Sequence, residues 1–204
     1  GIVAIYVIFL MVEQGTYSKK LSAMFPNAEQ RDDAAEILKS IGANITDYVG
    51  IKTWISFLLG VAIYAALWIL GVDHAMVWAI LSLLLNYIPF IGPIIAIIFP
   101  ALTAVLSSTN WVWIGGVTAA VTLIQFLFGY VVEPRMMGNR LGVSPLIVLI
   151  TLSIFGGIWG LAGMFLSVPL TVILIIVFGH FQSTRWIAIM LSETGEIPDV
   201  DHMH

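Results

Sequence analysis

The chain lacks cysteine and carries little charge, and each shortage excludes a class of protein. Without cysteine there is no disulfide framework, no thiol redox chemistry and no sulfur-ligated metal site. Charged residues make up 10% of the 204 residues and hydrophobic residues 60%, whereas roughly one-quarter of a soluble domain is charged. The mean hydropathy is +1.02. The net charge of −4 comes from polar loops and the tail, and nothing in it indicates nucleic-acid binding. The composition excludes a soluble fold.

Charge is absent from two long stretches, Ala75 to Val132 and Leu141 to Gly179. An apolar run of about 20 residues crosses a bilayer, and basic residues gather in cytoplasmic loops. The eight basic residues all lie outside these stretches: Lys19, Lys20, Arg31, Lys39, Lys52, Arg135, Arg140 and Arg185. The sequence therefore predicts an all-α, polytopic membrane protein whose basic loops face the cytoplasm.

The polar segments near the start contain the first expected elements. Residues 1–12 are apolar with no basic region before them, so we interpret them as the end of a truncated transmembrane helix and not as a signal peptide. Residues 13–52 are predicted to be a cytoplasmic segment with an amphipathic helix, which Asn27 and Gln30 begin as a capping box. We expect this helix to lie against the membrane or a neighbouring subunit. The alternative is a soluble helix of a folded domain.

Residues 53–106 are predicted to form one span and a broken hairpin. Thr53 to Leu70 is the span, and the turn after it has no Lys or Arg, as expected on the outer side of the membrane. The apolar run that follows is too long for one crossing and too short for two. Proline within a helix costs about 3 kcal/mol, so we expect a break at Pro89, Gly92 and Pro93. Broken backbone within a membrane must be buried in protein or line a wet cavity.

Residues 107–179 repeat this plan with the opposite topology. Trp111 to Val132 is the span, and the run from Val143 to Phe178 is again too long for one crossing. Glycines are expected to break its centre, and Pro169 is expected to break it later. Two units of inverted topology, each with a Gly/Pro-interrupted segment, are typical of secondary transporters. Residues 180–204 are left as a cytoplasmic tail.

Few polar side chains lie within the apolar runs, and Asn86 and Gln125 are the candidates for a substrate path. We add the break at Pro89, Gly92 and Pro93 to this path. Polar residues within a membrane often mark a pathway, and neutral hydrogen-bonding groups suit a hydroxylated solute better than a bare cation. The alternative is packing, in which Asn86 caps broken backbone and Gln125 bonds a neighbouring helix for about 1 kcal/mol.

Glu133, Pro134 and Arg135 lie where the second span meets the cytoplasm. Pro134 is expected to end the helix. The opposed charges of its neighbours form a candidate gate at the inner mouth, or Glu133 exchanges a proton. The alternative is a helix end with interfacial charges, from which Arg135 extends to the lipid headgroups.

Gly156, Gly160 and Gly163 are candidates for a hinge in the second hairpin. The alternative is close helix packing through small residues spaced four apart. His202 and His204 lie in the tail without further ligands nearby, so we predict no metal site and no cofactor. The sequence also contains no Gly-x-Ser-x-Gly, His-Glu-x-x-His or Gly-rich nucleotide loop. We therefore expect no enzyme, and transport that is passive or ion-coupled.

Four stretches of this sequence carry a resemblance to a known family. They are Asn-Tyr-Ile-Pro-Phe-Ile-Gly-Pro (86–93), Glu-Pro-Arg-Met-Met-Gly (133–138), Leu-Gly-Val-Ser-Pro (141–145) and Gly-Met-Phe-Leu-Ser-Val-Pro-Leu-Thr (163–171). Lys52-Thr53 and Trp159-Gly160 also fit. In this order the motifs resemble the autoinducer-2 exporter family of bacterial inner-membrane proteins. Members of that family are longer, with additional N-terminal spans and an extra-membrane helical region.

The resemblance implies a multi-pass inner-membrane protein that forms a homo-oligomer, a pentamer. It implies export of a small, neutral, polar solute, the quorum-sensing signal autoinducer-2, or in some relatives sodium/proton antiport. Antiporters usually carry an acidic residue deep in the membrane, and the nearest here is Glu133, at the border. A non-transporting membrane scaffold is a third alternative.

Overall fold

The computed structural model describes residues 28–137 and 142–195. The chain divides into two compact units, residues 1–43 and 44–204. The predicted truncated helix, the cap at Asn27 and the histidines of the tail lie outside the described residues. The first unit is therefore described only by the start of one helix, in which Leu38 is exposed and Ile37 and Ile41 are half-buried.

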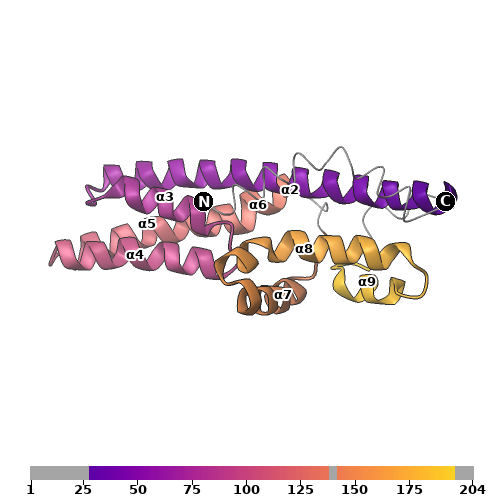
Figure 1. Ribbon diagram of the computed structural model, residues 1–204. Coiled ribbons are helices and arrows are strands. Elements are labelled where there is room, and N and C mark those ends of the chain that lie inside the picture. The colour runs from indigo at the N-terminus through magenta and orange to yellow at the C-terminus, as the bar shows by residue number, and fades with distance from the viewer. Residues whose placement is uncertain (1–27, 138–141, 196–204) are drawn as a thin grey trace. The chain divides into compact units, whose positions relative to one another are not determined.

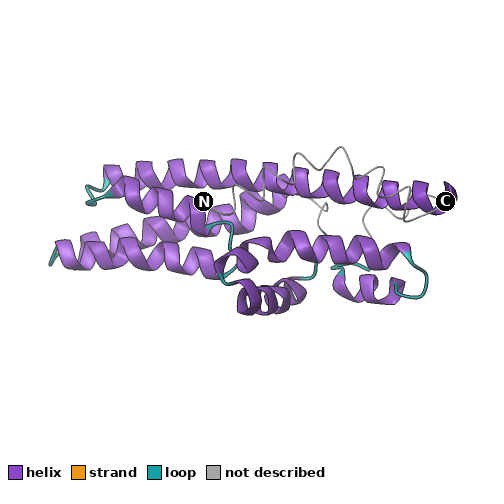
Figure 2. Ribbon diagram, viewed as in Figure 1, coloured by secondary structure: helices purple, strands orange, loops and turns teal. Residues whose placement is uncertain are grey.

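Every named element of the described ranges is a helix (Figure 1), and short loops join most of them (Figure 2). In chain order they are α2 (Ala28–Ile69), α3 (Ala75–Leu85), α4 (Ile91–Ser107), α5 (Trp111–Leu127), the π-helix η1 (Phe128–Val132), α6 (Glu133–Met137), α7 (Pro145–Trp159), α8 (Leu161–His180) and α9 (Arg185–Leu191). The prediction of an all-helical fold is confirmed for this part of the chain.

Within the described residues, three segments are long and apolar enough to cross a membrane: Ala34–Ile69, Trp111–Met137 and Leu161–His180. Large apolar side chains cover the outside of the helices. Trp68 is 69% exposed, Leu106 86% and Val112 85%. Water-soluble monomers rarely expose contiguous apolar surface on this scale. The chain is a polytopic membrane protein, as predicted; the inverted relation between its two halves stays a prediction.

Helix α2 joins two segments that the sequence analysis treats separately. The predicted amphipathic helix and the first span form one continuous helix of 42 residues. No proline interrupts it, and its glycines, Gly42, Gly50 and Gly60, each cost only about 1 kcal/mol relative to alanine. An uninterrupted helix therefore extends from the first polar segment into the membrane span.

The first predicted break lies between α3 and α4, which are separated by residues 86–90. Phe90 has a positive φ of 60°, which a bulky residue adopts only under constraint. A Cβ on Gly92 would lie 1.9 Å from the carbonyl oxygen of Leu85. Only glycine therefore allows the start of α4 to approach the end of α3 this closely. Pro93 lies in the first turn of α4, where its missing N–H costs little.

The second break lies between α7 and α8 and also depends on glycine. Gly160 has a φ of 63° and a ψ of −140°, a backbone conformation that is essentially restricted to glycine. A Cβ on Gly163 would lie 1.8 Å from the carbonyl oxygen of Phe155, and one on Gly156 would lie 2.9 Å from Cγ of Met164. The two helices therefore approach each other through these glycines.

Two prolines that were expected to interrupt helices lie inside them, so both expectations are wrong. Pro169 is buried within α8; membrane helices tolerate proline where their surroundings satisfy the freed backbone groups. Pro134 lies within α6, directly after η1. In this π-helix the N–H of Glu133 bonds to the carbonyl of Phe128, five residues earlier. The wider register relieves the clash that a proline ring makes with the preceding turn of an α-helix.

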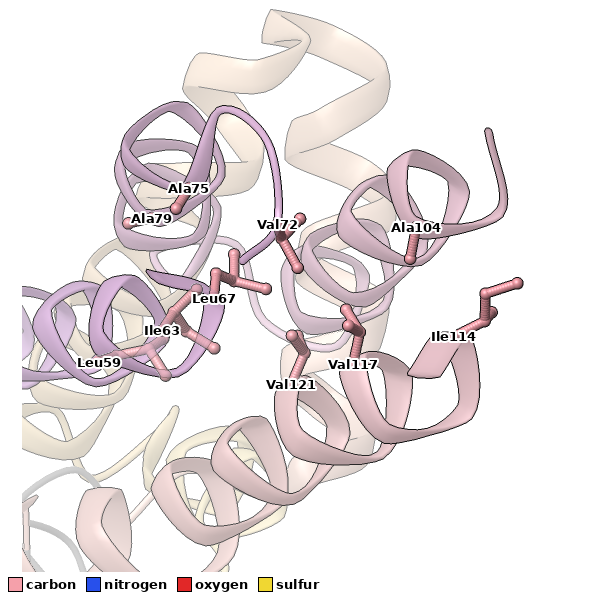
Figure 3. Packing of buried hydrophobic residues seen from close by; sticks show 10 residues of the cluster. All are labelled: Leu59, Ile63, Leu67, Val72, Ala75, Ala79, Ala104, Ile114, Val117 and Val121. Atoms are coloured by element: carbon pink, nitrogen blue, oxygen red, sulfur yellow. The ribbon is translucent and has the colours of Figure 1, made fainter. Parts of the chain in front are cut away.

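The core of the second unit lies where α2, α3, α4 and α5 meet (Figure 3). Its members are Leu59, Ile63, Leu67, Val72, Ala75, Ala79, Ala104, Ile114, Val117 and Val121. The α2 members recur every four residues and so share one face. The alanines let the helix axes approach. The indole nitrogen of Trp113 donates to the carbonyl of Leu70 at 2.8 Å. This packing directs one face of α2 toward the interior.

Candidate functional site

Polar side chains continue the interior face of α2 toward the first break. Tyr48, Lys52 and Ser56 are spaced four residues apart and precede Leu59 on this face. Lys52 is 3% exposed and Ser56 is fully buried. A helix that buries a lysine and a serine beside an apolar core must supply both with partners.

Lys52 forms an ion pair with Glu133, its Nζ contacting Oε1 of the carboxylate. The lysine side chain is 4% exposed and that of the glutamate 25%. Pairing offsets the large cost of burying an isolated ammonium group. Arg135, which the sequence places beside Glu133 as the opposed charge of a gate, is exposed instead. The pair therefore ties α2 to α6, and the sequence analysis missed its cationic member.

Glu133 is the first residue after η1. A π-helical turn contains one more residue than an α-helical turn, and such turns occur frequently at functional sites. The extra residue rotates everything after it by about 100° relative to a regular α-helix. The π-helix therefore determines the direction in which Glu133 points.

The first break is fastened to α2 by two hydrogen bonds between side chains. Asn86, which is 7% exposed, donates from Nδ2 to Oγ of Ser56 at 2.9 Å. The hydroxyl of Tyr87 donates to Oγ1 of Thr53 at 2.7 Å. Thr53 in turn donates to the carbonyl of Val49 at 2.6 Å. The broken backbone is thereby held against the polar face of α2.

An aromatic contact links this break to the second one. The rings of Tyr87 and Phe165 lie 4.9 Å apart between centroids, a favourable aromatic distance. Phe165 follows Gly163 by two residues on α8. The two breaks, far apart in sequence, therefore meet through one pair of side chains.

Gln125 lies on the buried face of α5. It is 5% exposed, and its Nε2 has no hydrogen-bond partner among the described residues. A buried amide without a partner is uncommon in folded proteins. This atom is therefore a free hydrogen-bond donor within the membrane-spanning part of the chain.

Helices α7 and α8 share a buried row of hydroxyl groups. Oγ1 of Thr171 donates to Oγ1 of Thr151 at 3.0 Å. The same Oγ1 lies 2.6 Å from the carbonyl oxygen of Ser167. Ser167 itself donates to the carbonyl of Met164 at 2.8 Å. Because these hydroxyls satisfy one another and the helix carbonyls, their arrangement is that of helix packing.

The structure thus brings together only part of the predicted site. The break residues Asn86, Pro89, Gly92 and Pro93 share one short segment, and the hinge glycines Gly156, Gly160 and Gly163 share another. Gln125, Glu133, Pro134 and Arg135 lie along one helical stretch, of which Arg135 and Pro134 are exposed.

Lys52 and Ser56 were missed by the sequence analysis. The sequence analysis treats Lys52 as a basic residue at the end of the predicted cytoplasmic segment and, with Thr53, as part of the family resemblance. The signal for both is that Tyr48, Lys52, Ser56 and Leu59 recur every three or four residues, which places them on the apolar and not the solvated face.

The chemistry available to these residues is neutral hydrogen bonding and one ion pair. Within residues 28–137 and 142–195 there is no cluster of three or more His, Cys, Asp or Glu that could hold a metal ion. Amides and hydroxyls at this depth can exchange hydrogen bonds with a polar solute. They offer no cage of anionic oxygens for a bare cation.

Comparison with known proteins identifies the family of the chain. The family model described as AI-2E family transporter matches residues 2–183. A candidate transport protein of Haemophilus influenzae is 38% identical over 97% of the chain and 56% of its own length. The AI-2 transport protein TqsA of Escherichia coli is 36% identical over 93% of the chain and 54% of its own length.

The chain spans about half the length of these relatives. The match to the family model nevertheless covers every named helix of the described residues except the last, α9, which contributes no residue to the site. The family is one of bacterial membrane transporters and not of enzymes. This multi-pass membrane protein belongs to the AI-2E transporter family.

Proposed function

We propose that the full-length protein exports a small, neutral, polar solute across the bacterial inner membrane, and that autoinducer-2 is the first solute to test. The name of the relative TqsA, an AI-2 transport protein, supports this choice. The chemistry of the buried residues supports the neutral class of solute. Carbonyl, hydroxyl and amide groups recognise one another without the desolvation cost that charges carry.

The observation that carries the proposal is the bond from Asn86 to Ser56 at the first break. Both residues are buried and uncharged. Asn86 lies at the break itself, and Ser56 lies on α2, against which the break is held. A hydroxylated solute can replace this bond with bonds of its own at little net cost. The segment from Asn86 to Pro93 is then the moving wall of the path.

The ion pair of Lys52 and Glu133 is the inner gate in this proposal. It joins α2 to the end of the span that leads to the predicted cytoplasmic loop. Opening that end requires the two charges to separate and to become solvated, or to move together. The pair replaces the gate of Glu133 and Arg135 that the sequence suggested; the bend of the second hairpin at Gly156–Gly163 is the proposed hinge.

The proposal includes a homo-oligomer, a pentamer, as the working form. The exposed apolar faces of the helices are compatible with contact to both lipid and neighbouring subunits. The size of the oligomer follows from the family resemblance alone. Chemical crosslinking of the full-length protein in native membranes tests it.

Accumulation of autoinducer-2 outside cells tests the function. A strain that lacks the gene is complemented with the full-length wild type, with Asn86→Leu or with the lipid-facing control Val61→Leu. We expect extracellular signal to rise with the wild type and the control and to stay near the level of the deletion strain with Asn86→Leu. Equal extracellular autoinducer-2 in all strains would contradict the proposal.

Sodium/proton antiport is the second candidate, favoured by Glu133, the one partly buried carboxylate among the residues whose burial the structure describes. Its pairing with Lys52 argues against this role, since proton release and cation binding would both have to displace the lysine. Proteoliposomes of the full-length protein with a pH-sensitive dye decide between the two. Sodium-driven proton movement that Glu133→Gln abolishes would establish antiport.

A membrane scaffold without transport is the third alternative. It is indicated if cysteines introduced at 86–93 never react with water-soluble reagents.

A further inference from the structure

We infer that Gln125 is a solute-binding residue, which donates a hydrogen bond from Nε2 to an oxygen atom of the transported molecule. The inference rests on the proposed function and narrows its substrate class. The solute must present an accessible hydroxyl, ether or carbonyl oxygen to the middle of the membrane.

The first observation is the free donor itself. Gln125 is 5% exposed, and its Nε2 is one of two buried side-chain nitrogen or oxygen atoms without a partner among the described residues. The other is the indole nitrogen of Trp78. The Trp78 ring stacks on Phe99 with centroids 5.8 Å apart, so packing of a large apolar ring accounts for its burial. Glutamine has no comparable apolar surface that would account for its position.

The second observation is the depth of Gln125. It lies near the middle of Trp111–Met137, the second of the long apolar segments. The bilayer core contains no water that could accept a hydrogen bond from a side chain at this depth. A donor at this depth is costly unless something inside the protein accepts its hydrogen bond.

The third observation is the direction in which this part of α5 faces. Val121, one turn earlier, belongs to the core cluster with Leu59 of α2. Phe128, one turn later, packs against the cluster that contains Ile55 of α2. Gln125 lies between them on the same buried face of the helix. It is therefore directed toward the stretch of α2 in which Ser56 holds the first break.

The polarity of the free atom determines what can bind. Nε2 is the buried atom of this amide that has no partner among the described residues, and it donates. A solute group that only donates, such as an ammonium ion, leaves Nε2 unsatisfied, whereas a hydroxyl or carbonyl oxygen satisfies it. A site built to donate rejects analogues that lack the oxygen more strongly than an apolar pocket rejects an extra methylene group.

The experiment uses two variants of the full-length protein in membrane vesicles with autoinducer-2 as the solute. Gln125→Met keeps the length of the side chain without a donor, and Gln125→Leu removes the amide group with a shorter apolar side chain. We expect KM to rise about tenfold in each, the equivalent of one hydrogen bond. Leu123→Met, on an exposed position of the same helix, is the matched control and should keep the parent KM.

Thermal stability separates binding from a structural role. Removing an unsatisfied amide should leave the melting temperature of Gln125→Met unchanged or higher, while transport weakens. An unchanged KM in Gln125→Met, with wild-type transport intact, would overturn the inference and leave the proposed function standing.

A binding measurement covers the case in which the wild type moves no autoinducer-2. The 204 residues contain no cysteine; with any cysteine elsewhere in the full-length protein replaced by serine, the Gln125→Cys variant has one thiol whose alkylation by N-ethylmaleimide can be timed. Slower alkylation in the presence of autoinducer-2 or ribose would support a solute site at this position, although the proposed export had failed. An alkylation rate that neither compound changes would overturn the inference together with the function.

Discussion

Lys52 and Glu133 are 81 residues apart in the sequence and form an ion pair that joins α2 to α6. The two partners differ in exposure, since the lysine side chain is 4% exposed and the glutamate side chain 25%. Tyr48 is buried one turn before Lys52 on the same face. Loss of its partner should therefore cost more free energy at Lys52 than at Glu133. The lysine ammonium group is almost fully buried, whereas the glutamate carboxylate is partly exposed.

This asymmetry predicts unequal effects of the two single substitutions. Glu133→Gln leaves a buried ammonium group without its counter-charge and should destabilise the fold by about 3 kcal/mol. Lys52→Met leaves a partly exposed carboxylate and should cost less. The melting temperature of the full-length protein in detergent, followed by tryptophan fluorescence, measures both.

The double variant Lys52→Met/Glu133→Gln is the control for this prediction. It removes both charges and should recover most of the lost stability, because a neutral pair of similar volume often replaces a buried ion pair without loss. A greater loss in Lys52→Met than in Glu133→Gln would contradict the asymmetry.

The hydrogen bond between Asn86 and Ser56 predicts a measurable coupling between the two residues. In membrane proteins such bonds contribute about 0.6 to 1.7 kcal/mol. A double-mutant cycle of Asn86→Ala and Ser56→Ala should therefore give a coupling energy of about 1 kcal/mol. Thr53→Ala, which removes the acceptor of Tyr87, provides an independent comparison. Additive effects of the Asn86 and Ser56 substitutions would show that their contact contributes nothing to stability.

The sequence predicts the helical fold and the positions of both breaks well. Apolar runs of about 20 residues or more cross a membrane as helices, and glycine and proline mark where those helices end or approach one another. The close contacts of Gly92 with Leu85 and of Gly163 with Phe155 show why glycine is required there. These features depend on residues that are close together in the sequence, so they can be predicted from the sequence alone.

The partners of the polar residues are not predictable in this way. Glu133 has an opposite charge two residues away in Arg135, and only the packing of α2 against α5 makes Lys52 its partner. Pro134 and Pro169 were expected to end helices, because a single sequence does not show the π-helix before one or the buried surroundings of the other. The contact of Tyr87 with Phe165 likewise depends on how the two breaks are arranged in space.

The hydroxyl pair of Thr151 and Thr171 predicts how firmly α7 and α8 are joined. Thr171→Val keeps the shape of the side chain, removes the bond at 3.0 Å and leaves a buried hydroxyl beside a methyl group. We expect a loss of about 1 kcal/mol in the free energy of unfolding. Thr103→Val is the control, because Thr103 bonds to the carbonyl of Phe99 within its own helix and to no other described residue, so the change should be near neutral. Equal losses in the two variants would indicate that the contact between the helices is not the cause.

Gly92 gives the sharpest prediction about the first break. A methyl group in Gly92→Ala would meet the carbonyl oxygen of Leu85 at 1.9 Å, so backbone must move apart at the junction of α3 and α4. Overpacking that displaces backbone costs about 1 to 3 kcal/mol. We expect a lower melting temperature and loss of transport, with greater loss for Gly92→Leu, while insertion into the membrane is unchanged.

Gly115 provides the matched control, because a Cβ there would meet nothing within 4 Å and the residue lies within α5. Gly115→Ala should leave transport intact and stabilise the helix by up to about 1 kcal/mol, the difference in helix propensity between the two residues. Proteolysis at residues 86–90 then distinguishes the variants, since a junction that has been forced open is cut faster. Parent rates of transport and of cleavage in Gly92→Ala would show that the close approach of α4 to α3 is not needed for export, and that the first hairpin is only a scaffold.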